Sequence, residues 1–328
     1  MSTAGDLPTI ELSRGLVRHL QRAEEELVGR VVEYGVTAIT PKDLGTHVEL
    51  GSLRTQVHAI LREPGLALLR GVPLDNGLRS AELMLWILGL QLGSATSQNR
   101  HGDRIGKVTA DAVVQVGERG YRSRDELNLH TDSDDVLMCL CVSQAPEGGL
   151  SRFVHARDVY LRLAAEFPSQ LAILRRGFHY HWRGEGPSGE PPVTTYRVPV
   201  LAEQDGFVSC VYLRDQIELA ATAGAVRLSA EEVDALDVFD SVAHSSDLLI
   251  ERHMGPGEMY VLNNWTVLHS RTAYIDHSDP TRRRLLLRLW LKSVRAVQRG
   301  HHAQRRFYGG DGIEAVPHGA TTFDLNQG

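Results

Sequence analysis

Cysteine is scarce in this 328-residue sequence, and its placement excludes two structural roles. The three cysteines are Cys139, Cys141 and Cys210. An odd count without Cys-x-x-Cys spacing argues against a disulfide framework and against a thiolate zinc site. Because Cys139 and Cys141 lie in the apolar run 136–142, we expect buried, unreactive thiols.

Long hydrophobic runs are also missing. No stretch reaches the ~18 uninterrupted apolar residues that suggest a membrane helix. The first residues, MSTAGDLPTIELSRG, lack the basic and apolar regions of a signal peptide. These absences predict a soluble, cytoplasmic protein without a membrane partner.

Basic charge is not in excess. The sequence holds 35 lysines and arginines against 41 aspartates and glutamates, which gives a net charge of −6. A mildly acidic protein is a poor match for the phosphate backbone, so nucleic acid is not an expected partner. A small-molecule substrate remains the expected partner, and the pattern says nothing about oligomeric state.

Internal repeats and low-complexity linkers are absent as well. Hydrophobic residues make up 42% and charged residues 23%, as in ordinary globular proteins. We therefore expect one domain, with a helical N-terminal region 1–64, a core of about 65–292 and a C-terminal extension 293–328.

The hydrophobic pattern predicts a mainly β protein with surrounding helices. Ser13 and Gly35 are expected to cap the first helix, and Ser229 and Glu232 have the spacing of a capping box. Helices are expected at 13–35, 52–62, 81–92, 157–167 and 229–251. Strands are expected at 65–71, 107–116, 127–132, 136–144, 151–155, 176–182, 193–201, 206–213, 258–263 and 284–292. This order favours a barrel-like β sandwich with a helical shell.

Two short segments contain candidate metal ligands. In the expected strand 127–132, His130 and Asp132 point to the same face, because side chains two apart share a face of a strand. His269 ends a second apolar run. Two histidines and one carboxylate form the facial triad of non-haem iron oxygenases. Each of these patterns alone is weak evidence for a metal site, since His-x-Asp is common and a lone histidine is more often a core residue than a ligand.

A third segment, RRRLLLRLWL, is too apolar to be exposed. Arg284 and Arg288 are four residues apart, which places both on one face of a strand. A buried arginine is costly unless it meets an anion, and its planar guanidinium suits a carboxylate. We therefore expect a bound anionic ligand here rather than two structural ion pairs.

Together, the stretches LNLHTDSDD, PEGGLSRFVHA, MYVLNNWTVLHSRTAY and RRRLLLRLWL resemble the taurine dioxygenase and clavaminate synthase-like superfamily from about Gly65 to Leu291. The resemblance implies a double-stranded β-helix (jelly-roll) core and Fe(II) bound by His130, Asp132 and His269. It further implies that 2-oxoglutarate and O₂ are cosubstrates and that succinate and CO₂ are released.

The resemblance also assigns the residues that bind 2-oxoglutarate. Gly148-Gly149-Leu150-Ser151 matches the family's GG-x-[ST] element, so Ser151 would contact the cosubstrate. Arg284, Arg288 or both would bind its distal carboxylate, with Arg283 as the fallback, because a one-residue slip exchanges strand faces.

The expected reaction is hydroxylation of an unactivated C–H bond in an amino acid or small secondary metabolite, with desaturation and ring closure as variants. The main alternative is a jelly-roll metalloprotein that is a hydrolase, an isomerase or a ligand-binding protein. Ser151, Arg284 and Arg288 argue against it, and Asp132 argues against a halogenase. Weak candidates for substrate contacts are Asn128, Asp134, Asp135, Arg183 and Arg214. A solvated acidic turn is an equally good interpretation of Asp134 and Asp135.

The segment 183–197 holds three glycines and three prolines, so it cannot be a regular helix or central strand. Long irregular loops in compact domains are often functional. The segment is either a lid over the reactive iron site or a passive connector.

Overall fold

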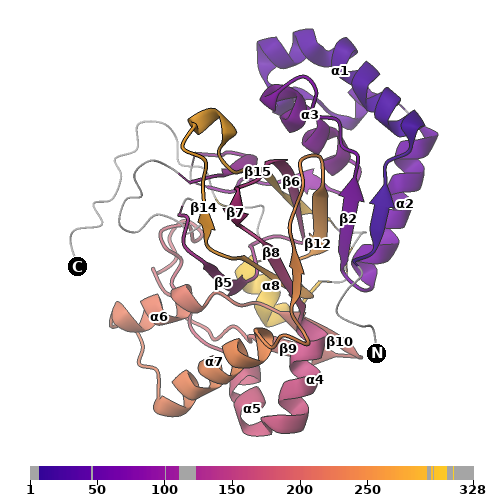
Figure 1. Ribbon diagram of the computed structural model, residues 1–328. Helices are drawn as coiled ribbons and strands as arrows, with labels where there is room; N and C mark the ends of the chain where they lie inside the picture. Colours follow the sequence, from indigo (N-terminus) through magenta and orange to yellow (C-terminus); the bar gives the residue numbers. More distant parts are fainter. Residues whose placement is uncertain are drawn as a thin grey trace.

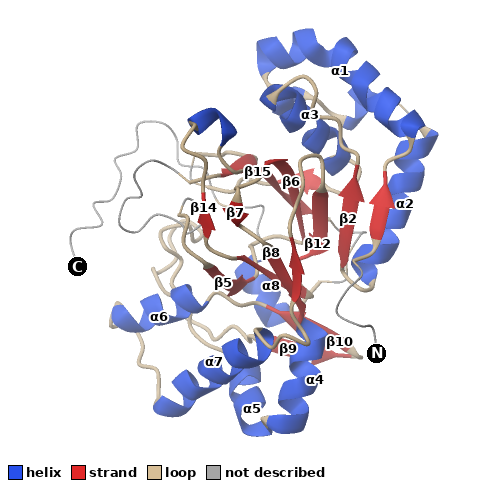
Figure 2. Cartoon of the chain, viewed as in Figure 1, coloured by secondary structure: helices blue, strands red, loops and turns tan. Residues whose placement is uncertain are grey.

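The chain is described from a computed structural model that covers residues 7–45, 47–99, 101–110, 123–293, 297, 299–308 and 313. Its centre is a pair of mainly antiparallel β sheets, with helices at both ends (Figure 1). The first three helices gather beside one sheet, whereas α4 to α7 lie at the opposite end of the molecule (Figure 2).

The helices differ in length and position along the chain. Those described are α1 (Arg14–Tyr34), α2 (Val48–Arg62), α3 (Leu78–Gly89), α4 (Ala156–Glu166), α5 (Pro168–Arg176), α6 (Arg214–Thr222), α7 (Ala230–Ala243) and α8 (His302–Tyr308). No helix within these described residues combines the length and apolar character needed to cross a membrane.

The larger sheet, which we call the major sheet, contains seven strands. Its order is β1 (Thr9–Glu11), β2 (Leu66–Arg70), β12 (Met259–Asn263), β6 (Val136–Ser143), β15 (Leu285–Lys292) and β3 (Ser94–Ala95), and β4 (Ile105–Val108) also pairs with β15. Only the pair β1 and β2 is parallel. Strand β1 belongs to the expected helical region 1–64, so that region shares a sheet with the core.

The minor sheet has four antiparallel strands. Its order is β11 (Ile250–Arg252), β8 (Ser151–His155), β13 (Val267–Arg271) and β5 (Leu127–His130). Two short pairs complete the strands described, namely β9 (Leu201–Gln204) with β10 (Phe207–Cys210) and β7 (Glu147–Gly148) with β14 (Tyr274–Ile275).

The two sheets enclose a core that follows from strand alternation. On β15, Leu286 and Trp290 belong to the apolar cluster between the sheets, which places Arg288 on the same face. Phe153 of the minor sheet meets Tyr260 of the major sheet edge to face, with ring centroids 5.0 Å apart. The other face of the major sheet, including Leu289, packs on the helices. The site residues therefore project into the space between two rigid sheets.

Several expected elements are confirmed. The side chain of Ser13 accepts a hydrogen bond from the backbone N–H of Leu16 and begins α1, and Gly35 ends it with φ 82°. The Ser229–Glu232 capping box begins α7. The cysteines are free and buried, as expected.

Other expectations are wrong. Residues 176–182 are not a strand, because α5 continues to Arg176 and only isolated bridges follow, at Phe178 and His181. The expected strand 193–201 is likewise reduced to isolated bridges before β9. The helix expected over 229–251 ends at Ala243, and residues 250 and 251 of the expected range belong to β11 instead. Helices α5 and α6 were not expected, and residues 111–116 of the expected strand 107–116 lie outside the described residues.

Candidate active site

The two histidines of the candidate triad face each other across the minor sheet. His130 ends β5, and His269 is the middle residue of β13. The two residues are direct partners in the antiparallel register. Their rings lie 4.4 Å apart at an angle of 45°. Strand pairing alone therefore places both imidazoles at one point.

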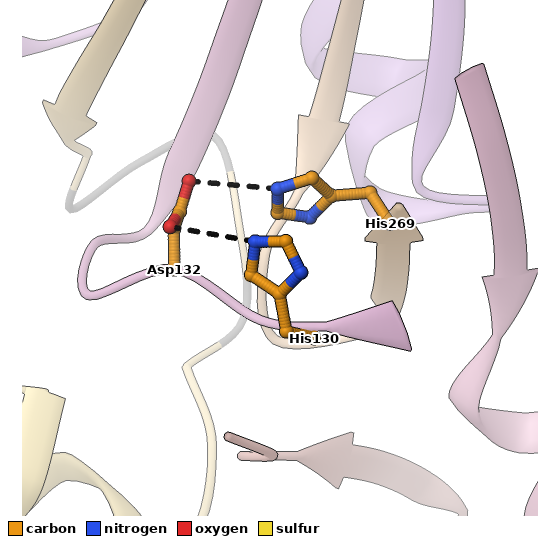
Figure 3. A group of neighbouring side chains, drawn as sticks. All are labelled: His130, Asp132 and His269. Atoms are coloured by element: carbon orange, nitrogen blue, oxygen red, sulfur yellow. Dashed lines mark ion pairs between the residues drawn. The ribbon is translucent and has the colours of Figure 1, made fainter. Parts of the chain in front are cut away.

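Asp132 follows β5 and completes the group (Figure 3). One carboxylate oxygen lies 3.5 Å from His269 Nε2, and the other lies 4.0 Å from His130 Nε2. One potential ligand atom from each of the three residues lies within 4.8 Å of the others. Among the described residues, this is the one group of three or more such side chains that could hold a metal ion.

Hydrogen bonding prepares His130 as a ligand. Its Nδ1 lies 2.8 Å from the carbonyl oxygen of Asn128, so Nδ1 carries the proton and donates it there. The lone pair then lies on Nε2, which faces Asp132 (Figure 3). Burial, aided by the nearby His269, lowers the pKa of His130 to about 4. The imidazole is therefore neutral at pH 7, as metal binding requires.

The Asp132 carboxylate is held in its ionised form. Burial alone would raise the pKa of Asp132, but Arg288 and the two histidines outweigh it and hold that pKa well below its usual range. Arg288 Nη1 lies 3.4 Å from Oδ2, and Trp290 Nε1 donates to the same oxygen at 2.9 Å. A charged carboxylate next to two imidazoles is a donor set that suits Fe(II).

Asn264, in the turn between β12 and β13, fixes the backbone of Asp132. Its side-chain oxygen accepts from the N–H of Asp132 at 2.9 Å, and its amide donates back to the carbonyl of Asp132. The amide also donates to the carbonyl of Asp134 at 2.9 Å. Asn264 therefore holds the Asp132 segment against the strand that carries His269.

A pocket opens beside the triad and contains every residue that the family resemblance assigns to 2-oxoglutarate. Ser151, Arg284 and Arg288 all line it, whereas Arg283 does not. Arg271, Tyr260, Cys139 and Trp290 contribute further parts of the wall. Arg284 and Arg288 therefore reach one cavity, as their spacing predicted.

Arg284 has an incomplete set of partners. Its side chain is buried, and Nε donates to Gln144 Oε1 at 3.0 Å. The Nη1 atom is buried without a hydrogen-bond partner. Gly149 permits this placement, because a Cβ there would lie 2.9 Å from Arg284 Nε. A buried guanidinium with an unsatisfied donor in a pocket is suited to bind a carboxylate.

Arg288 is placed differently from Arg284. Its Nε donates to Gln98 Oε1 at 2.8 Å, and its guanidinium carbon lies 4.7 Å from the centre of the Trp290 ring. With Asp132 as a further contact, Arg288 is oriented toward the triad. The two arginines therefore mark different positions along the pocket.

The weak substrate candidates separate into two groups. Asn128, Arg183 and Arg214 line the pocket, whereas Asp134 and Asp135 do not. Asp135 accepts from Trp265 Nε1 and pairs with Arg299. Asp134 is buried against Thr96. Both aspartates are therefore buried rather than solvated. Both also lie outside this pocket, where a substrate in it would not contact them.

Arg214 is already occupied by acidic partners. Its guanidinium lies 2.6 to 2.7 Å from the carboxylates of Glu218, Asp237 and Asp240. These carboxylates raise its pKa further above the usual range, although burial opposes them. Arg214 is therefore a structural part of the pocket wall.

Sequence patterns did not identify Asn264, Trp290, Gln98 and Gln144 as supporting residues. A signal existed for Trp290, which lies two residues after Arg288 on one strand and so shares its face. No local pattern connects Gln98 or Gln144 with residues at least 140 positions away.

Comparisons with known proteins agree with this geometry. Residues 35–290 match the family described as taurine catabolism dioxygenase TauD, TfdA family. FR-33289 synthase of Streptomyces rubellomurinus is 34% identical over 238 residues, which are 69% of this chain and 68% of that protein. A taurine hydroxylase-like protein of Stachybotrys chartarum is 26% identical over 254 residues, 72% of this chain and 63% of that protein.

Solved structures resemble the fold. Asparagine oxygenase, solved with Fe(II), 3-hydroxyasparagine and succinate, has a TM-score of 0.66 and 17% identity, and the match covers 94% of this chain and 99% of that one. The non-haem iron oxygenase OrfP, solved with iron and α-ketoglutaric acid, has a TM-score of 0.64 and 14% identity over 88% and 94% of the two chains. These likenesses confirm the expected jelly-roll fold. On the extent of the family match, the chain belongs to the TauD/TfdA dioxygenase family.

Proposed function

We propose that this protein is an Fe(II)- and 2-oxoglutarate-dependent oxygenase that hydroxylates a C–H bond of an amino acid or another small metabolite. His130, Asp132 and His269 bind the iron. Arg284, assisted by Ser151, binds the distal carboxylate of 2-oxoglutarate. The observation that carries the proposal is the occurrence, in one pocket, of a complete triad and a buried arginine with an unsatisfied donor.

The residues of the site fit both groups. Two imidazoles and one carboxylate leave other coordination positions open. Arg284 offers Nη1 to a carboxylate inside the pocket, where burial strengthens a charge-assisted hydrogen bond. When bound, the iron with 2-oxoglutarate and O₂ supplies the oxidising power for C–H hydroxylation.

The protein's own contribution is orientation and protection. Asn128 directs His130 Nε2 inward, while Trp290 and Arg288 orient Asp132. The pocket lies between two sheets, which limits access of water to the reacting atoms. A hydrolase or isomerase has no need for a second buried cation such as Arg284, and this disfavours the metalloprotein alternative.

The test is conversion of 2-oxoglutarate to succinate by purified protein with Fe(II) and O₂. We expect succinate formation that a chelator stops and that Asp132→Ala abolishes. Asp103→Ala, at an exposed loop position, is the control and should behave as wild type. Succinate formation by Asp132→Ala at the wild-type rate would contradict the assignment of Asp132 as a ligand.

A further inference from the structure

Arg183 differs from the other arginines that line the pocket. Arg214 is bound by three carboxylates, and Arg288 by Gln98 and Asp132. Arg271 donates to the carbonyl oxygens of Ser123 and Thr272. Arg284 is assigned to the cosubstrate.

The guanidinium of Arg183 has a single, loose partner in the described structure. Its Nη2 lies 3.6 Å from Asp215 Oδ2, beyond ordinary hydrogen-bond length. The side chain of Asp215 is 66% exposed, whereas that of Arg183 is 32% exposed. An ion pair this open to water contributes little, so a ligand anion in the pocket can compete with Asp215 for the guanidinium.

The backbone holds Arg183 in a conformation that non-glycine residues rarely adopt. Its φ is 52°, in the left-handed region. The N–H of Arg183 donates to His181 Nδ1 at 2.9 Å, and the N–H of Glu185 donates to the Trp182 carbonyl at 2.9 Å. Trp182 in turn stacks on Phe307, with centroids 4.6 Å apart. Strained residues that the surrounding structure fixes in this way cluster at active sites and ligand-binding segments.

We propose that Arg183 binds an anionic group of the primary substrate, a carboxylate or a sulfonate, and that this anion displaces Asp215 from the guanidinium. The proposal rests on the function proposed above and names the substrate class of the same pocket. Because Arg183 and the triad line one cavity, a substrate bound through its anion would extend toward the metal position. Asp215, in the first turn of α6, is the resting partner.

The experiment uses pairs of compounds that differ in one anionic group. L-Amino acids are compared with their C-terminal amides, and taurine with its sulfonamide, so that the two arms distinguish carboxylate from sulfonate. The readouts are succinate formation above the substrate-free rate and the shift in melting temperature of the loaded protein without O₂. We expect the anionic members alone to accelerate turnover and to raise the melting temperature.

The variants isolate the guanidinium. Arg183→Gly suits the left-handed backbone, so it should fold while KM for the anionic compound rises ~10- to 100-fold. Asp215→Asn removes only the competitor, and KM should stay constant or fall. The matched control is Arg157→Ala, because Arg157 has a similarly loose pair, 3.7 Å from Glu63, and does not line the pocket.

Equal acceleration by charged and neutral members would overturn the proposal, as would an unchanged KM in Arg183→Gly. Substrate-free turnover of 2-oxoglutarate by the wild type reports on the proposed function separately. If that turnover is present while the anion preference is absent, only the role of Arg183 fails.

Discussion

Arg284 and Arg288 show how two identical side chains acquire different roles through their neighbours. Arg284 Nη1 has no partner, whereas Arg288 contacts Gln98, Asp132 and the ring of Trp290. The sequence spacing predicted that both reach the same ligand site. It could not separate their roles, because the distinction depends on glutamines that are distant in the sequence.

This difference predicts unequal effects of lysine substitution. Arg284→Lys keeps the charge but loses the forked geometry, so KM for 2-oxoglutarate should rise by a factor that corresponds to ~2–5 kcal/mol. Arg288→Lys should mainly lower the catalytic rate, because it disturbs Asp132. Steady-state kinetics with varied 2-oxoglutarate measures both.

Arg283→Lys is the matched control and should leave that KM unchanged, because Arg283 does not line the pocket. If KM for 2-oxoglutarate is raised in Arg283→Lys and normal in the other two variants, Arg283 binds the cosubstrate instead of Arg284.

Asn264 is predicted to act on the metal without touching it. Asn264→Ala removes the hydrogen bonds that fix the backbone of Asp132, so metal affinity should fall ~10- to 100-fold. The free energy of unfolding should fall by ~1–3 kcal/mol, since buried backbone groups lose partners. Calorimetric titration with Fe(II) in the absence of O₂ and urea unfolding measure the two effects. If Asn264→Ala is destabilised but still binds Fe(II) with wild-type affinity, Asn264 stabilises the fold without affecting the metal site.

At the scale of elements, strand β5, which carries His130, was predictable, whereas strand β13, which carries His269, and the irregular segment 183–197 were not. Alternation in residues 127–132 is a local signal that predicted β5, although the strand ends at His130 and Asp132 lies just beyond it. The irregular backbone after α5 depends instead on distant partners, since His181 N–H donates to the carbonyl of Gln216. The apolar residues in 176–182 have a strand-like pattern, although the backbone there forms only isolated bridges, at Phe178 and His181.

The loop 183–197 remains a proposed lid, and the structure restricts which part of it could move. Its base is held by the bridge between His181 and Val193 and by Trp182 packed on Phe307. Arg183 and Glu185 are the loop residues that line the pocket. We therefore expect slower hydrogen exchange at 183–191 when substrate joins the iron and 2-oxoglutarate complex.

Hydrogen exchange measured by mass spectrometry, with and without an accepted substrate, tests this restriction. The surface loop 223–229 serves as the internal control and should exchange equally in both states. Equal exchange of 183–191 in both states would leave the segment as a connector.

At the scale of the whole molecule, partly buried histidines predict a pH-dependent stability. Burial lowers the pKa of His58 and His155, and burial together with the stacked His47 lowers that of His19. A depressed pKa means that the unfolded chain binds protons first as the pH falls below about 6.5. Stability should therefore be highest above that pH and decline below it, and in metal-free protein the contribution of His130 is lost progressively as the pH falls from about 6.5 to about 4.

Melting temperatures of metal-free protein between about pH 7.5 and pH 5 measure this dependence. His19→Gln should reduce the slope, because it removes one of the stacked imidazoles. A melting temperature that rises as the pH falls through this window would contradict the assignment of neutral histidines in the folded state.

The central claim is that one pocket joins a three-residue iron site to a 2-oxoglutarate site. Calorimetry without O₂ tests it most directly, with 2-oxoglutarate added to protein that has been titrated with Fe(II). We predict one Fe(II) per chain, binding of 2-oxoglutarate that weakens in Arg284→Lys, and a weak visible charge-transfer band that requires both components. Iron-loaded protein that shows neither the band nor detectable 2-oxoglutarate binding would contradict the account.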